Sequence, residues 1–92
     1  MLTELEVSGE AARRVAAALG NETSLRILEL VSTRGLDVST VANKLGLTES
    51  TISVDLQELE TIGLIDVTYA KGKRGIRKIC RLAKDRICIK LR

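Results

Sequence analysis

The stretch "LGLTESTISVDLQELETIGLI", residues 45–65, combines a buried helical stripe with a polar outer face. Ile52, Leu56 and Leu59 fall within a narrow arc at 100° per residue, so we expect them to face the protein core. The pattern predicts a helix over about residues 49–62 whose opposite side meets solvent or a partner.

The outer side of this helix carries short, neutral groups suited to reading base edges. Gln57 has the paired donor and acceptor that match adenine, hydroxyl groups suit several bases, and Val54 can contact a thymine methyl. The candidate DNA-binding residues of the helix and its cap are Thr48, Ser50, Thr51, Ser53, Val54 and Gln57. An ordinary amphipathic helix with a solvated face is the alternative interpretation.

Acidic side chains make DNA binding by this helix less obvious. Glu49, Asp55, Glu58 and Glu60 lie on it, and it has no Lys or Arg. Glu49 sits at the helix start, where the dipole favours a carboxylate. The others fall near the buried arc or to the sides, so most of the acids avoid the face that a groove would meet.

Three helices are predicted before this one. Residues 8–20 and 21–35 each show apolar residues at helical spacing, the second with Leu25, Leu28 and Val31 as its buried stripe. The segment "STVANKLG" (residues 39–46) predicts a third helix that is capped by Ser39 and ends at a glycine. The tight turn into the fourth helix has the spacing of a helix-turn-helix.

After Gly63 the period changes from helix to strand. "LIDVTYA" and "IRKICRLA" alternate in polarity around "KGKRG", which predicts a β-hairpin with a glycine-rich turn. The candidate DNA-binding residues of this hairpin are Lys71, Lys73, Arg74, Arg77 and Lys78. "RICIKLR" (residues 86–92) alternates again and predicts one more strand.

Positive charge is concentrated at the end of the chain. The net charge is +3, yet ten of the 15 Lys and Arg residues and only one of the 12 acidic residues follow Ala70. Such asymmetry is the electrostatic footprint of nucleic-acid binding. A solvated basic tail is the simpler alternative.

Composition narrows the function classes further. The chain has 92 residues and no His, which excludes imidazole catalysis and His-bound zinc, so we expect no enzyme, metal or cofactor. We expect a single domain over residues 1–92, a cytoplasmic location and no membrane partner, because no apolar run could cross a bilayer. A core this small also favours self-association.

Two cysteines lie in the predicted C-terminal strands. If residues 83–85 form a loop, Cys80 lies opposite Cys88 and the pair could form a disulfide. If the turn is one residue shorter, the pair is out of register. Two buried free thiols are the alternative, as is usual for cytosolic cysteines.

Three stretches resemble the ArsR-type winged-helix transcription regulators. They are "AALGNETSLRILELV", "VANKLGLTESTISVDLQELETIGLI" and the basic hairpin "VTYAKGKRGIRKI". The resemblance implies an α+β winged helix-turn-helix fold with about four helices, a hairpin wing and an extra C-terminal strand. It also implies a homodimer on double-stranded DNA, with one recognition helix per subunit in successive major grooves and the wing, about residues 70–78, on the flanking backbone or minor groove.

The sequence departs from the family pattern at informative positions. Family members commonly carry basic or His residues where this chain has Val54 and Asp55, and an Arg where it has Ser24. The wing is therefore expected to supply more of the affinity. The third helix has no Cys, so metal sensing of the familiar kind is not expected. A winged-helix module that binds a protein through its acidic front is the alternative function.

Overall fold

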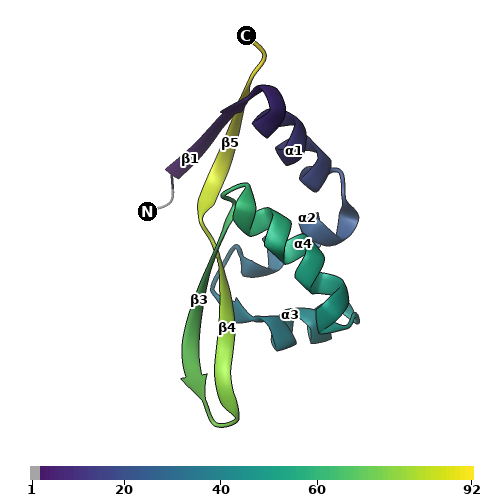
Figure 1. Ribbon diagram of the computed structural model, residues 1–92, viewed down its shortest axis with the longest axis vertical. Helices are drawn as coiled ribbons and strands as arrows, with labels where there is room; N and C mark the ends of the chain where they lie inside the picture. Colours follow the sequence, from purple (N-terminus) through teal and green to yellow (C-terminus); the bar gives the residue numbers. More distant parts are fainter. Residues whose placement is uncertain (1–2) are drawn as a thin grey trace.

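The computed structural model describes residues 3–92, so Met1 and Leu2 of the predicted domain lie outside the described residues. Figure 1 shows the helices at one side of two small sheets. The molecule measures 49 × 27 × 19 Å. The helices are α1 (Gly9–Leu19), α2 (Glu22–Val31), α3 (Val38–Leu45) and α4 (Glu49–Thr61). Within residues 3–92, no helix is long and apolar enough to cross a membrane.

A three-stranded antiparallel sheet carries the predicted hairpin. It contains β2 (Leu36–Asp37), β3 (Ile65–Gly72) and β4 (Gly75–Leu82), in the order β2-β4-β3. Gly75 adopts φ +117°, which a residue with a side chain rarely does, and so suits the tight turn at the tip. The predicted hairpin is confirmed, and it projects beyond the helices (Figure 1).

A second sheet joins the two ends of the described chain. β1 (Thr3–Ser8) pairs in parallel with β5 (Lys84–Lys90). The extra C-terminal strand is therefore confirmed, whereas β1 was not predicted. Leu5 and Ile87 pack against the main core and hold this sheet on the helices.

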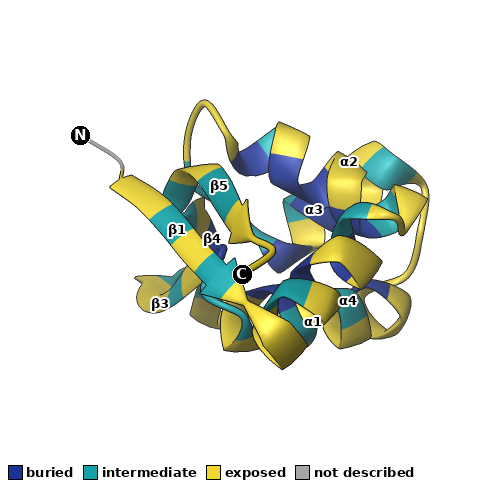
Figure 2. Cartoon of the chain, turned by 90° about the horizontal axis from the view of Figure 1, so that it is seen from above, coloured by how far each residue is buried: buried dark blue, intermediate teal, exposed yellow. Residues whose placement is uncertain are grey.

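The core forms where the helices meet the base of the hairpin, and its dark blue segments line the inner sides of the helices in Figure 2. The predicted α4 stripe is confirmed, since Ile52, Leu56 and Leu59 are at most 1% exposed. In α2 the prediction was wrong for Leu25, which is 42% exposed. The buried residues of α2 are Ser24, Ile27, Leu28 and Val31, which follow the spacing 0, 3, 4, 7, so the buried stripe includes Ile27 and leaves Leu25 out.

Neither of the two registers considered for Cys80 and Cys88 occurs. β5 follows β4 after a single residue and pairs with β1 rather than folding back on β4. Cys80 consequently lies opposite Val67 in one sheet, and Cys88 opposite Glu6 in the other. Both thiols are free.

Candidate nucleic-acid interface

The outward face of α4 presents the predicted base-reading residues together. Ser50, Thr51, Ser53, Val54 and Gln57 are all exposed, Val54 by 71%. The predicted cap is confirmed, because Thr48 Oγ1 accepts the backbone N–H of Thr51 at 3.2 Å. Cap and buried stripe together fix which side of the helix is free.

Hydrogen bonds within α4 occupy some of these hydroxyls. Ser53 Oγ donates to the backbone oxygen of Glu49 at 2.8 Å, and the hydroxyls of Thr48 and Thr51 are 2.8 Å apart. The side-chain amide of Gln57 makes no hydrogen bond to any part of the chain that the structure describes. Gln57 is therefore the freest long polar group on this face.

Two of the acids on α4 are held by neighbouring helices. Ser39 Oγ of α3 donates to Glu49 Oε2 at 2.9 Å. Arg14 of α1 donates two hydrogen bonds to the Glu58 carboxylate, at 2.7 and 3.1 Å, and these lower the pKa of Glu58. No local sequence pattern indicated this pair, whose members are 44 residues apart. Such contacts turn part of the negative charge toward the protein.

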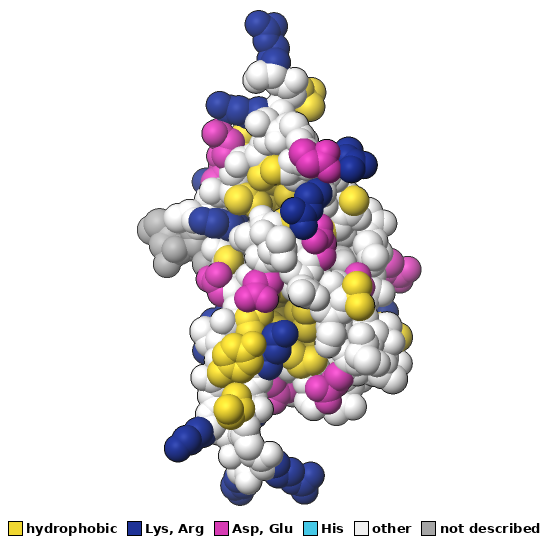
Figure 3. Space-filling model, in the orientation of Figure 1, with side chains coloured by type: hydrophobic (Ala, Val, Ile, Leu, Met, Phe, Trp, Pro, Cys, Tyr) yellow, Lys and Arg dark blue, Asp and Glu magenta, His cyan; other side chains and the backbone are white. Residues whose placement is uncertain are grey.

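The tip of the wing carries free positive charge. Lys71 lies near the end of β3, and Lys73 and Arg74 form the turn between the strands. All three are exposed, and none makes an ion pair with the described residues. Figure 3 shows Lys and Arg side chains clustered at this end of the molecule. They are placed as phosphate contacts require.

Arg77 has a partner within the protein as well as an exposed position. Its Nε donates to Asp37 Oδ2 at 2.9 Å, and Nη2 donates to the same oxygen. Asp37 Oδ1 also accepts the backbone N–H of Thr40 at 2.7 Å. The hydrogen bonds from Thr40, followed by those from Arg77, lower the pKa of Asp37 to about 2. Arg77 thus ties the wing to the start of α3.

Asp37 is a structural residue that the sequence reasoning missed. It caps α3, whereas Ser39 was predicted as the cap, so that prediction was wrong. The available signal was an Asp three residues before Thr40, the spacing of a side chain that caps a helix start.

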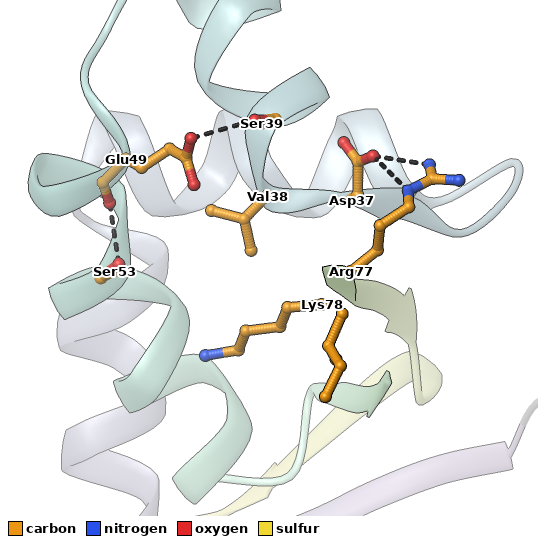
Figure 4. Close-up of a pocket in the computed structure, with 8 residues that line it drawn as sticks. Asp37, Val38, Ser39, Glu49, Ser53, Arg77 and Lys78 are labelled. Atoms are coloured by element: carbon orange, nitrogen blue, oxygen red, sulfur yellow. Dashed lines mark hydrogen bonds and ion pairs between the residues drawn. The ribbon is translucent and has the colours of Figure 1, made fainter. Parts of the chain in front are cut away.

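A hollow of about 260 Å³ separates the wing from α3 and α4. Figure 4 shows side chains from all three elements around it. The lining residues are Asp37, Val38, Ser39, Glu49, Ser53, Ile76, Arg77 and Lys78. Three predicted residues, Ser53, Arg77 and Lys78, therefore meet in one place. Ile76, which was not predicted, joins them.

The basic residues of β5 lie away from this hollow and face acids of β1. Lys90 Nζ is 3.6 Å from Glu6 Oε2, and Arg86 lies opposite Glu4. The ligand atoms of Glu4, Glu6 and Cys88 lie within 4.8 Å of one another, although Glu6 is already paired with Lys90. The basic last quarter of the sequence therefore divides into two regions.

Comparisons with solved structures agree with this architecture. The chain is 31% identical to the homodimeric winged helix-turn-helix DNA-binding domain of Mb0332 from Mycobacterium bovis, with a TM-score of 0.69, covering 80% of this chain and 65% of that one. The chain is 26% identical to HlyU from Vibrio cholerae, with a TM-score of 0.68, and the match covers 80% of this chain and 76% of that one. It is also 26% identical to NolR from Sinorhizobium fredii, with a TM-score of 0.67, and that match covers 83% of this chain and 72% of that one. A comparison with curated protein sequences finds no match.

The fold and the exposed face of α4 define a winged-helix DNA-binding transcription regulator. The model of the bacterial regulatory proteins of the arsR family matches residues 21–67, from the cap of α2 into β3. The chain belongs to this ArsR family.

Proposed function

We propose that residues 1–92 form one DNA-binding domain that recognises a specific duplex sequence in the cytoplasm. The outward face of α4 enters the major groove, and the tip of the wing contacts the flanking backbone or minor groove. The observation that carries this proposal is the free positive charge of Lys71, Lys73 and Arg74 at the tip of a wing that lines one hollow with α4, whose exposed face is neutral and polar over its first turns. Phosphate contacts then provide affinity for any duplex, and base contacts provide specificity for its sequence.

Binding to duplexes selected from a random pool tests this proposal. We expect affinity to fall steeply as salt rises, because each phosphate contact releases counterions. We also expect Gln57→Ala to relax the preference at one base pair, at a cost of about 1–3 kcal/mol for the preferred site. Salt-independent binding, or no binding, would favour a protein-binding module instead.

We further propose that the regulator acts as a homodimer. The neighbour from Mycobacterium bovis is described as homodimeric. In this chain Ala16 and Ala17 of α1 are exposed, as are Ile89 (40%) near the end of β5 and Leu91 (94%) just after it. Dimeric helix-turn-helix proteins bind half-sites about one DNA turn, roughly 34 Å, apart, and we expect the two α4 helices of this dimer to have that spacing.

Sedimentation at tens of micromolar, an order of magnitude suited to regulator dimers, tests this assembly. The dimer should be weakened by Ala17→Glu, which adds a charge to α1, and unaffected by Lys73→Ala in the wing. A wild-type monomer under these conditions contradicts the proposal.

A further inference from the structure

The inner face of the wing carries two exposed apolar side chains. The β3–β4 register pairs Tyr69 with Lys78 and Lys71 with Ile76. These four residues share a face with Cys80, which is fully buried under the helices, so the face turns toward the helical side. Even so, Tyr69 is 68% and Ile76 is 77% exposed.

Tyr69 and Ile76 are diagonal neighbours across the two strands, a position within reach of an aromatic ring. Lys71 and Lys78 complete the square, so apolar and cationic groups alternate on this face. Figure 3 shows apolar side chains gathered on the wing next to Lys or Arg. Adjacent exposed apolar groups indicate a binding surface, and the flanking cations indicate a polyanion as its partner.

The opposite wall of the hollow belongs to the recognition helix. Ile76 and Ser53 line the same hollow, and Val54, next to Ser53 in α4, is 71% exposed. A duplex seated on α4 would therefore bring its groove edge to the inner face of the wing. Thymine is the base whose major-groove edge carries an apolar group, the C5 methyl.

We propose that Tyr69 and Ile76, on the inner face of the wing, contact thymine methyl groups at the edge of the major groove that α4 occupies, while the cations of the tip lie on the flanking backbone. The wing would then contribute to sequence specificity as well as to affinity. This inference rests on the proposed DNA-binding function. Apolar contact with deoxyribose is the competing account, and it carries no sequence information. The two accounts differ in whether the methyl group itself contributes to binding.

Replacing thymine by uracil removes only that methyl group. A duplex selected from a random pool is prepared with thymine or uracil at each A·T pair in turn, and the affinity of the full chain is measured for each. At one or more positions we expect uracil to weaken wild-type binding by about threefold to tenfold, the effect of one buried methyl group. The double variant Tyr69→Ala, Ile76→Ala should bind both versions equally at those positions.

Val54→Ala is the comparison variant, because Val54 is similarly exposed on α4 and could contact a thymine methyl of its own. It should keep the thymine preference at the positions where the wing variant loses it, and any preference that it loses should fall at another A·T pair. The wing variant should also keep the wild-type salt slope, because apolar contacts release no counterions. Circular dichroism confirms that each variant is folded.

The inference is overturned if wild type binds thymine and uracil duplexes equally at every position, or if the wing variant keeps the full preference. It is also overturned if the preference disappears with Val54→Ala alone. In these cases salt-dependent binding of wild type would leave the DNA-binding function standing. Absence of any DNA binding would remove both.

Discussion

The wing and the β1–β5 sheet are both rich in Lys and Arg, but they place this charge differently. At the wing tip Lys71, Lys73 and Arg74 are exposed and make no ion pair with residues 3–92. In the other sheet Lys90 lies beside Glu6, and Lys84 donates a hydrogen bond to Thr3. Figure 3 shows basic groups at both ends of the long axis, with acidic groups close to those of the upper end.

A count of charges along a sequence therefore does not locate a binding surface. A cation with an acidic neighbour has much of its field cancelled, whereas a free one attracts phosphate. We therefore expect DNA contact at the wing, whereas β1–β5 joins the first and last described strands.

The largest expected effect separates the two sets of cations. Replacing Lys71, Lys73 and Arg74 by Ala should make the salt slope shallower by about three units and weaken binding roughly hundredfold at 0.1 M salt, because three phosphate contacts are lost. Fluorescence anisotropy with a labelled duplex at several salt concentrations measures both quantities.

The matched control replaces Lys84, Arg86 and Lys90 of β5 by Ala. It removes the same number of charges, but we expect a change in affinity below about threefold and an unchanged slope, because these groups make no phosphate contact. Equal losses in the two triple variants would abolish the proposed division.

The cysteines provide a second comparison, with one in each region. Cys80 is fully buried, and burial raises the pKa of its thiol, whereas Cys88 is only half-buried. Since the thiolate is the reactive form, Cys88 should be alkylated more than about tenfold faster than Cys80 in the folded protein at pH 8. Mass spectrometry after timed alkylation measures the two rates. Similar rates, or no free thiol after unfolding, would contradict this placement.

Asp37 should account for a smaller effect, on stability. Asp37→Ala removes both the α3 cap and the partner of Arg77, so the free energy of unfolding should fall by about 1–2 kcal/mol. Asp37→Asn keeps an acceptor for Thr40 but loses the charge, and should lie between wild type and Asp37→Ala. Urea denaturation at pH 7 provides the values.

The pH dependence checks the same residue. Because the pKa of Asp37 is lowered in the folded state to about 2, its carboxylate stabilises the fold fully above the ordinary pKa. That contribution should decline as pH falls from about 4 toward 2. The difference between wild type and Asp37→Asn should therefore shrink in this range, and a constant difference would show that the charge is unimportant.

The smallest effect is expected at the ion pair of the second sheet. Glu6 and Lys90 are both more than half exposed, so Glu6→Gln should change the free energy of unfolding by less than about 1 kcal/mol. DNA affinity should not change. A large change in either quantity, measured by urea denaturation and anisotropy, would mean that the two regions are coupled.

Local patterns predicted the elements that depend on neighbours in sequence. The cap at Thr48, the buried stripe of α4 and the glycines of the hairpin all follow from spacing of a few residues. The polarity of Leu5 and Val7 against Glu4 and Glu6 also alternates, and this signal of β1 was available in the sequence.

Long-range contacts were not predictable in the same way. The pairing of β5 with β1, and that of Arg14 with Glu58, join residues that are far apart in the chain. Charge and periodicity show that a strand or an acid exists, but not which partner it meets. The individual residues of the candidate interface could therefore be predicted from the sequence. The hydrogen bonds between Arg77 and Asp37, which are 40 residues apart, could be recognised only in the folded structure.

A map of backbone amide chemical shifts during titration with a selected duplex tests most directly whether DNA lies against α4 and the wing. We expect the largest chemical-shift changes at residues 48–57 and 71–78, with little change in β1 and β5. Largest changes in β1 and β5, with α4 unaffected, would contradict this placement of the DNA.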